Sequence, residues 1–325
     1  MVRSHGIQDS RRCGRDMNPR MHRHVACAGF ILAMVLSATP ASAQFDFSGE
    51  WVTPRAVIPG EALAQQFEDG PDRANGPEIG DYTGLPLNDF ARKKAEAWSA
   101  SVIAQPERQG NPHPAQYSMR GGGGPNIRIS KVIDPVSSGW TGYRIDGFYN
   151  GGNRTIWLDG REHPGPYAEH LWTGFSTGVW QGRMLKVTTT HMKLGFIRRN
   201  GVPAGPRTTM TEYFVRHGNY LTVITVLDDP DYLEEYFVRD VSLRWAPEQV
   251  VGPATIVDPS DELGDKPLGW VPHTPPGTRH TDFAKRYGLP FEVTQGGKET
   301  RYPEYQKKLA ELIARDRQAA REPQR

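Results

Sequence analysis

Apolar and polar residues alternate along the middle of the chain, from residue 126 to residue 245. Successive side chains of a strand point to opposite faces, so this alternation indicates strands with one buried face. Connections rich in Gly and Asn, such as Gln181-Gly182 and His217-Gly218-Asn219, suit hairpin turns. The pattern predicts eight strands, near Ile127–Ile133, Trp140–Tyr149, Arg154–Leu158, Phe175–Trp180, Arg183–Met192, Thr208–Arg216, Tyr220–Leu227 and Glu235–Trp245.

A row of antiparallel strands has two edge strands with unpaired backbone N–H and C=O groups unless the sheet closes on itself. We therefore expect an all-β fold, an antiparallel meander that closes into a lipocalin-like barrel or a strongly curved sheet. Another strand is expected at Phe45–Trp51, where Gly49-Glu50-Trp51 resembles the opening of lipocalins.

Pro-rich and Gly-rich segments flank the strands at residues 54–125 and 246–301, and we interpret them as long wrapping loops. Two peripheral helices are expected. One begins at Asn88 or Asp89 and ends near Ala104, with Phe90, Ala97 and Trp98 facing inward. The other begins near Pro303, with an apolar stripe that includes Tyr305. The expected organisation is a barrel domain over residues 44–301 and a packed helix over residues 302–325 with a frayed end.

Residues 1–43 have the composition of an export signal. Basic residues precede an apolar run from Val25 to Ala38, and Ala41-Ser42-Ala43 offers the small residues of a cleavage site. We expect a bacterial protein that is periplasmic or secreted after cleavage near Ala43. The apolar run is too short to span a bilayer comfortably, and no membrane span is expected.

Cleavage would change two properties of the chain. Both cysteines, Cys13 and Cys27, lie in residues 1–43, so no disulfide and no thiol nucleophile is expected in the mature protein. The same segment holds six Arg and two Asp, so its loss takes the formal net charge from +2 to −2. A weakly acidic protein is not attracted to a phosphate backbone, and no nucleic-acid partner is expected.

Candidate chemistry is concentrated between Arg154 and His191. Asp159-Gly160-Arg161-Glu162-His163 can be a simple β-turn, in which Asp159 bonds the backbone and Arg161 pairs with a carboxylate. Alternatively, Asp159 orients His163, which acts as an acid or base near neutral pH. Alternation over 185–191 predicts that His191 ends its strand pointing into the barrel mouth as a second proton carrier.

Aromatic and basic residues nearby complete this candidate site. An apolar wall is expected from Trp157, Trp172 and Phe175, and an anion clamp from Arg161 or Arg198. His170 and Arg199 are further expected ligand-binding residues. The same histidines could hold a divalent metal, but no closely spaced ligand pair such as H-x-H is present. We therefore expect neither a metal nor another cofactor.

Gly174-Phe-Ser-Thr-Gly178 matches the G-x-S-x-G pattern of serine hydrolases, but a hairpin pattern follows it where that motif requires a helix. We interpret it as the glycine-flanked start of a strand. Together with Arg154–Pro164, Thr189-Thr-His-Met-Lys193, Arg198–Pro203 and other motifs in the same order, it resembles a family of uncharacterised exported bacterial proteins over residues 84 to 310. The resemblance implies export and a shared site, and no reaction. Gln109-Gly110-Asn111 stands where those relatives have Gln-Cys-x, so a disulfide possible in them is absent here.

These patterns favour an exported enzyme that acts on a small organic molecule by His and Asp acid–base chemistry, of lyase, isomerase or hydrolase type. The alternative is a lipocalin-like carrier of an apolar ligand, since a barrel mouth can hold one small molecule. A third possibility is a metal-dependent hydrolase built on the histidines. The oligomeric state does not follow from the sequence.

Overall fold

The structure is a computed structural model of the 325-residue chain. It describes residues 46–52, 79–98, 114–118, 126–147, 154–198, 200–249, 274–275, 277–319 and 321. The contacts within the chain divide it into residues 1–43 and residues 44–325, and every element below belongs to the second unit. The expected export signal, the relatives' Cys position and Arg199 lie outside the described residues.

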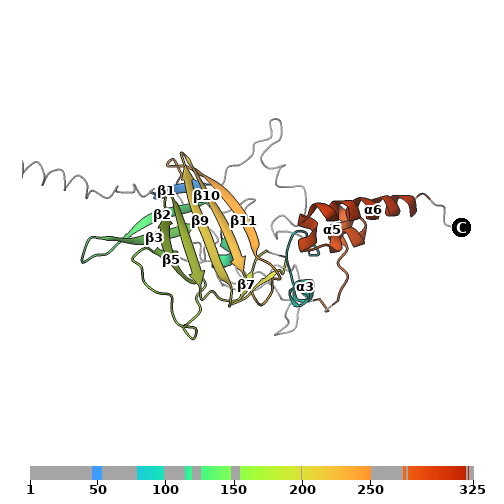
Figure 1. Ribbon diagram of the computed structural model, residues 1–325, viewed down its shortest axis with the longest axis horizontal. Helices are drawn as coiled ribbons and strands as arrows, with labels where there is room; N and C mark the ends of the chain where they lie inside the picture. Colours follow the sequence, from blue (N-terminus) through green and yellow to red (C-terminus); the bar gives the residue numbers. More distant parts are fainter. Residues whose placement is uncertain are drawn as a thin grey trace, which may run out of the picture. The chain divides into compact units, whose positions relative to one another are not determined.

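Among the described residues, nine strands form a closed barrel (Figure 1). Its strands are β1 (Gly49–Val52), β2 (Ile127–Ile133), β3 (Trp140–Gly147), β4 (Arg154–Trp157), β5 (Phe175–Gln181), β6 (Met184–Thr190), β9 (Thr209–His217), β10 (Tyr220–Asp228) and β11 (Phe237–Trp245). The order around the barrel is β1-β11-β10-β9-β6-β5-β4-β3-β2, and β1 closes the ring by pairing with β2. The predicted all-β barrel is confirmed. Two short strands, β7 (Gly195–Phe196) and β8 (Pro203–Ala204), form a separate hairpin.

One strand pair departs from the predicted antiparallel meander. β4 and β5 run parallel, with Ile156 opposite Ser176 and Trp157 opposite Thr177. A parallel pair needs a crossover that returns the chain to the starting end, and here residues 158–174 make it. Alternation within a strand says nothing about the direction of its neighbour, so the pattern could not distinguish this crossover from a hairpin.

The barrel interior contains two apolar clusters with a buried polar layer between them. On β9, Phe214 belongs to the first cluster and Met210 to the second, and the fully buried Glu212 lies between them. Thr225 on β10 is paired with Glu212 in register and is also fully buried. Small barrels are usually filled by side chains, and these described interior positions follow that rule.

The first peripheral helix, α3 (Asp89–Glu96), begins where it was predicted. The Asn88 side chain accepts a hydrogen bond from the backbone of Ala91 and so caps the helix. The predicted inward face was wrong at Phe90, whose side chain is 62% exposed and stacks on Tyr232, whereas Ala91 and Ala95 are buried. Ala97 and Trp98, which follow the helix, are half-buried. Small residues face the barrel end, where there is little space between the helix and its neighbours.

The C-terminal part contains α5 (Asp282–Arg286), the 3-10 turns η3 (Phe291–Gln295) and η4 (Lys298–Arg301), and α6 (Pro303–Ala319). α6 begins at the predicted Pro303 and contacts η3 and η4 through the buried Tyr305 side of the helix. A further short helix, α4 (Ala115–Ser118), precedes the barrel strands. In the described part of the chain, no helix is long and apolar enough to cross a membrane.

Candidate functional site

The crossover of residues 158–174 lies on the outer wall of the barrel, over the end of β5 and β6. Thr177 and Thr190 alternate with the buried Ser176 and Thr189, so they face outward. His163 of the crossover contacts both outward-facing threonines. His191 also contacts the outward-facing Thr190, so the prediction that His191 points into the barrel mouth was wrong.

A continuous chain of hydrogen bonds links two of the histidines. His163 Nε2 lies 2.8 Å from Thr177 Oγ1, and His163 Nδ1 lies 2.8 Å from Thr190 Oγ1. Thr190 Oγ1 is also 2.8 Å from His191 Nδ1, and His191 Nε2 is 2.9 Å from the Gly165 carbonyl oxygen. All four imidazole nitrogens are therefore engaged.

The chemistry of these partners fixes the direction of the bonds. The Gly165 carbonyl can only accept, so His191 Nε2 carries a proton. A neutral His191 then accepts from the Thr190 hydroxyl at Nδ1, and Thr190 accepts in turn from His163 Nδ1. His163 Nε2 is left to accept from Thr177.

The backbone at His191 explains why the alternation of β6 stops. His191 has a φ of 56°, in the left-handed region that few residues other than glycine adopt. β6 ends at Thr190, so the His191 side chain turns back toward its neighbour on the outer wall. Burial lowers the pKa of His163, and the charge of His191 lowers it further. Both effects favour neutral His163.

Of the three histidines in this segment, His170 is the one whose basic nitrogen has no partner among the described residues. Its Nδ1 lies 2.8 Å from the Met192 carbonyl oxygen, which can only accept, so the proton sits on Nδ1. The Nε2 lone pair has no hydrogen-bond partner among the described residues. The His170 ring lies beside the His191 ring, with 5.2 Å between their centroids.

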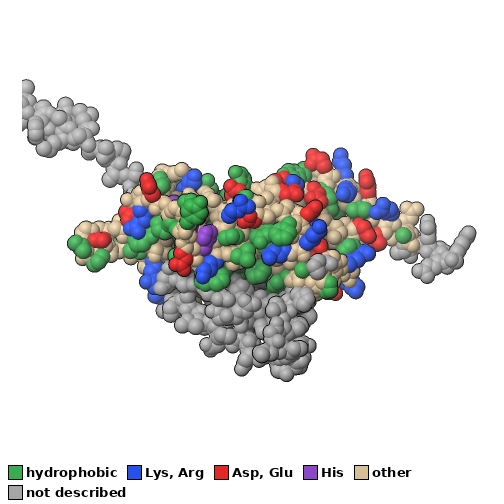
Figure 2. Space-filling model, turned by 90° about the horizontal axis from the view of Figure 1, so that it is seen from below, with side chains coloured by type: hydrophobic (Ala, Val, Ile, Leu, Met, Phe, Trp, Pro, Cys, Tyr) green, Lys and Arg blue, Asp and Glu red, His purple; other side chains and the backbone are tan. Residues whose placement is uncertain are grey.

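The two chain segments that meet at His170 carry two further side chains, Trp172 and Lys193. The Lys193 ammonium lies 5.1 Å from the centroid of the Trp172 ring, and no described carboxylate pairs with it. Leu171 and Met192 form an isolated parallel β-bridge, so the segment that contains His170 and Trp172 lies beside the residues just before Lys193. We call His163, His170, Trp172, His191 and Lys193 the outer-wall patch. On the face in Figure 2, histidine side chains reach the surface among hydrophobic and basic ones.

Asp159 does not orient His163. Its carboxylate forms an ion pair with Arg161, whose Nε lies 2.9 Å from Asp159 Oδ1, and this pairing lowers the pKa of Asp159. The chain bends at Asp159, Gly160 has a φ of 78°, and the Arg161 backbone N–H donates to Asp159 Oδ1 at 3.3 Å, so these contacts follow the simpler interpretation. Arg161 is only two residues from Asp159, so its guanidinium reaches the carboxylate, and no described imidazole contacts that carboxylate. The Arg161 guanidinium also covers the Trp157 ring at 3.5 Å.

The other predicted binding residues are divided between two places. Phe175 belongs to the outer wall, where its ring meets His163 edge to face at 5.3 Å between centroids. Arg198 lies elsewhere, with its Nη1 3.7 Å from Asp81 Oδ2, so it does not clamp an anion beside the histidines. The β7–β8 hairpin, which begins at Gly195, turns this segment away from the end of β6.

A buried ion pair that the sequence analysis did not identify occupies the polar layer of the barrel interior. Arg154 pairs with Glu212, and both side chains are at most 2% exposed. Arg154 also donates to Ser176 Oγ at 3.1 Å and to Thr189 Oγ1 at 2.8 Å. Ser176 is therefore a buried structural hydroxyl. Gly174, with a φ of 63°, is needed because a Cβ there would lie 2.7 Å from the Thr190 carbonyl oxygen.

Comparisons with known proteins do not decide between the possible functions. The chain matches no protein-family model, no curated protein and no solved structure. The resemblance to exported bacterial proteins therefore remains a prediction. Within the described ranges, no group of three histidine or acidic side chains is arranged to hold a metal ion.

Proposed function

We propose that the protein is an enzyme that transfers protons to and from a small organic anion at the outer-wall patch. The observation that carries this proposal is the His170 ring, whose Nδ1 is fixed by the Met192 carbonyl while Nε2 keeps a free lone pair. A general base needs an unprotonated nitrogen on a ring that is held in a fixed orientation. His170 therefore takes the role that the sequence suggested for His163.

The neighbours of His170 indicate the kind of substrate. Trp172 offers an apolar surface, and the Lys193 ammonium above it attracts a carboxylate or an enolate oxygen. His163 and His191 already use both of their nitrogens, so they act as positioning residues that hold the crossover against β5 and β6. These roles favour an isomerase or a lyase that removes a proton next to a carbonyl group.

Hydrogen exchange tests the proposal before the substrate is known. The purified chain would be incubated in D₂O with a panel of small carboxylic and oxo acids, and ¹H NMR would follow the loss of carbon-bound protons. His170→Asn keeps a donor near the Met192 carbonyl and removes the lone pair. We expect it to slow exchange or conversion by about 10²- to 10⁴-fold. Lys193→Met should raise KM more than it lowers kcat.

The matched control is His217→Gln on the hairpin that joins β9 and β10. His217 Nε2 bonds Thr222 Oγ1 at 3.0 Å, and glutamine can keep that bond. Full activity in His217→Gln together with strong loss in His170→Asn supports the assignment. Full activity in His170→Asn would refute it.

Export belongs to the same proposal and rests on the composition of residues 1–43. N-terminal sequencing of the protein recovered from a bacterial periplasm should begin at or next to Gln44. Recovery of the chain only in the cytoplasm, with residues 1–43 attached, would contradict export.

A binding role inside the barrel is the second candidate. It is favoured by three buried atoms without hydrogen-bond partners in the described structure, namely Arg154 Nη1, Glu212 Oε1 and Thr225 Oγ1. A guest with both a donor and an acceptor would satisfy them. Native mass spectrometry should then detect a small polar molecule that stays bound to the folded chain. A mass equal to that of the chain alone would contradict this binding role and would leave water as the partner of the three atoms.

A further inference from the structure

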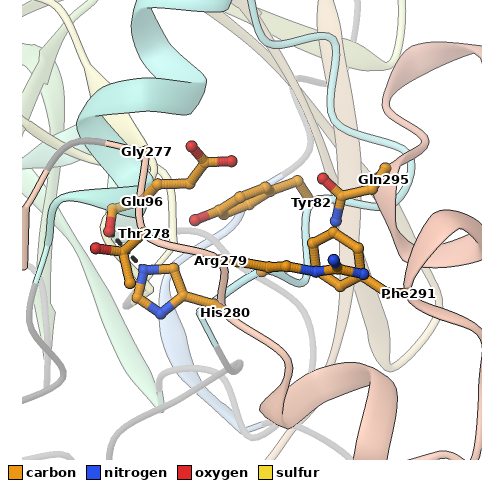
Figure 3. Close-up of a pocket in the computed structure, with 9 residues that line it drawn as sticks. Tyr82, Glu96, Gly277, Thr278, Arg279, His280, Phe291 and Gln295 are labelled. Atoms are coloured by element: carbon orange, nitrogen blue, oxygen red, sulfur yellow. Dashed lines mark hydrogen bonds between the residues drawn. The ribbon is translucent and has the colours of Figure 1, made fainter.

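A cavity lies where α3 meets the segment before α5 and the turn η3, and no residue of the outer-wall patch is among those that line it. Its volume is about 270 Å³, and Tyr82, Glu96, Arg279, His280, Phe291 and Gln295 are among the residues that line it (Figure 3). Pockets for drug-sized ligands usually measure about 300–1,000 Å³, so this cavity suits a smaller molecule.

The wall around Glu96 is held in place by backbone bonds. The Glu96 carbonyl oxygen, at the C-terminal end of α3, accepts hydrogen bonds from His280 Nε2 and Thr274 Oγ1, both at 2.6 Å. Such bonds satisfy a carbonyl that has no partner within its own helix. His280 therefore fastens the segment before α5 to the end of α3, and the Glu96 carboxylate is left free to face the cavity (Figure 3).

Tyr82 contributes a buried hydroxyl that lacks a partner. The residue is 1% exposed, and its hydroxyl oxygen makes no hydrogen bond of ordinary geometry among the described residues, although the Gly80 backbone lies close enough to lower its pKa. Figure 3 shows this hydroxyl pointing into the space between Glu96 and His280. Burial is the main reason why the pKa of Tyr82 is raised, and the nearby Glu96 charge raises it further. An unpaired buried hydroxyl costs free energy, so it marks a place where a ligand can bind.

Opposite charges stand on the two sides of the cavity. Glu96 has no ion-pair partner among the described residues. On another side of the cavity, the Arg279 guanidinium lies over the Phe291 ring, 3.9 Å from its centroid (Figure 3). Among the described residues, the carboxylate that pairs with Arg279 is Glu292, at 3.7 Å, and both side chains of that pair are more than half exposed. Exposed pairs of this kind contribute little, so a ligand carboxylate can take the place of Glu292.

We propose that this cavity binds a small zwitterion of the α-amino-acid class. Its ammonium group would donate to the Glu96 carboxylate and the Tyr82 oxygen, and its carboxylate would accept from Arg279. An ammonium has three donors, and the two carboxylate oxygens of Glu96 together with the Tyr82 oxygen offer three acceptors. A guanidinium held against an aromatic ring presents its remaining N–H groups in the geometry that a carboxylate needs.

Calorimetry on the full chain tests the proposal. The probes are the twenty common amino acids, each compared with its decarboxylated amine and its deaminated acid. We expect saturable binding of at least one amino acid, and at least tenfold weaker binding of the amine and the acid that lack one charge. Glu96→Gln and Arg279→Gln should each weaken binding of that amino acid at least tenfold. Tyr82→Phe removes the hydroxyl but keeps the aromatic ring, and it should also weaken binding.

Glu292→Gln is the matched control, because it removes the residue that competes for Arg279. It should leave affinity unchanged or increase it. Thermal unfolding of each variant establishes that it is folded. If another substitution disturbs packing, Tyr82→Phe still tests the site, because it leaves the buried ring in place. Absence of binding by every amino acid would overturn the proposal. So would equal binding of an amine without the carboxylate, or affinity that is insensitive to both Glu96→Gln and Arg279→Gln.

Discussion

Removal of one member of the buried Arg154–Glu212 pair should destabilise the barrel strongly. Both side chains are at most 2% exposed and lie between two apolar clusters. Glu212→Gln leaves the Arg154 charge without its counter-charge in the interior. Breaking a buried pair in this way costs about 3–5 kcal/mol of unfolding free energy. For a chain of this size, that loss lowers the midpoint of thermal unfolding by roughly 10 °C.

Replacing both partners should be far less harmful. In Arg154→Met with Glu212→Leu, no charge stays buried, and Ser176 and Thr189 keep their mutual hydrogen bond of 2.9 Å. Substituting a buried pair by apolar residues is often neutral or stabilising by about 1–4 kcal/mol. The double variant should therefore be more stable than either single variant, with a coupling energy of several kcal/mol.

Urea unfolding followed by circular dichroism and tryptophan fluorescence gives the four free energies of this cycle. The control is Glu248→Gln, because Glu248 pairs with Arg244 at 2.8 Å on the surface and is 53% exposed. That change should cost less than about 1 kcal/mol. The reasoning is refuted if Glu212→Gln costs no more than Glu248→Gln, or if the double variant loses the sum of the single losses.

Three further predictions concern pH, packing and capping. Because the pKa of His163 is lowered in the fold, the stability due to its neutral form is complete above about pH 6.5 and is lost as the pH falls toward the folded pKa. On acidification, the urea midpoint of His163→Gln should therefore decline less than that of the unmodified chain. An identical decline would contradict this. Gly142→Ala should destabilise by several times more than Gly165→Ala in thermal unfolding, since a Cβ at Gly142 would lie 2.4 Å from a β4 backbone oxygen and one at Gly165 meets nothing within 4 Å. Asn88→Ala should cost about 1 kcal/mol in urea unfolding through loss of the α3 cap, whereas no change would mean that the cap is dispensable.

The sequence predicted the strands well because each strand carries its own evidence. Alternation and turn residues are local, and β9 at Thr209–His217 and β10 at Tyr220–Asp228 lie within two residues of their predicted bounds. The parallel pairing of β4 and β5 was not predicted, because direction depends on the path of the crossover. Local pattern therefore determines which residues form strands, and the connections determine how the strands are paired.

The candidate site was predicted in part. The segment that holds His163, His170 and His191 was identified from its concentration of histidines, and the structure brings the three together. The orientation was wrong because a left-handed φ at His191 cannot be inferred from alternation. The cavity at Tyr82 and Arg279 was not identified, since its walls come from segments far apart in the chain with no shared periodicity.

β1 closes the barrel with only four residues, and this has a consequence for how the chain reaches its fold. Trp51 of β1 pairs with Trp245 of β11 and with Ile127 of β2, so the first and last strands in sequence are neighbours. Closure therefore waits until the whole strand region has been made, and contacts of such sequence separation form slowly. Until then β2 and β11 present open edges, to which the β1 segment of another molecule can add. The interval before closure is when chains are most prone to exchange strands.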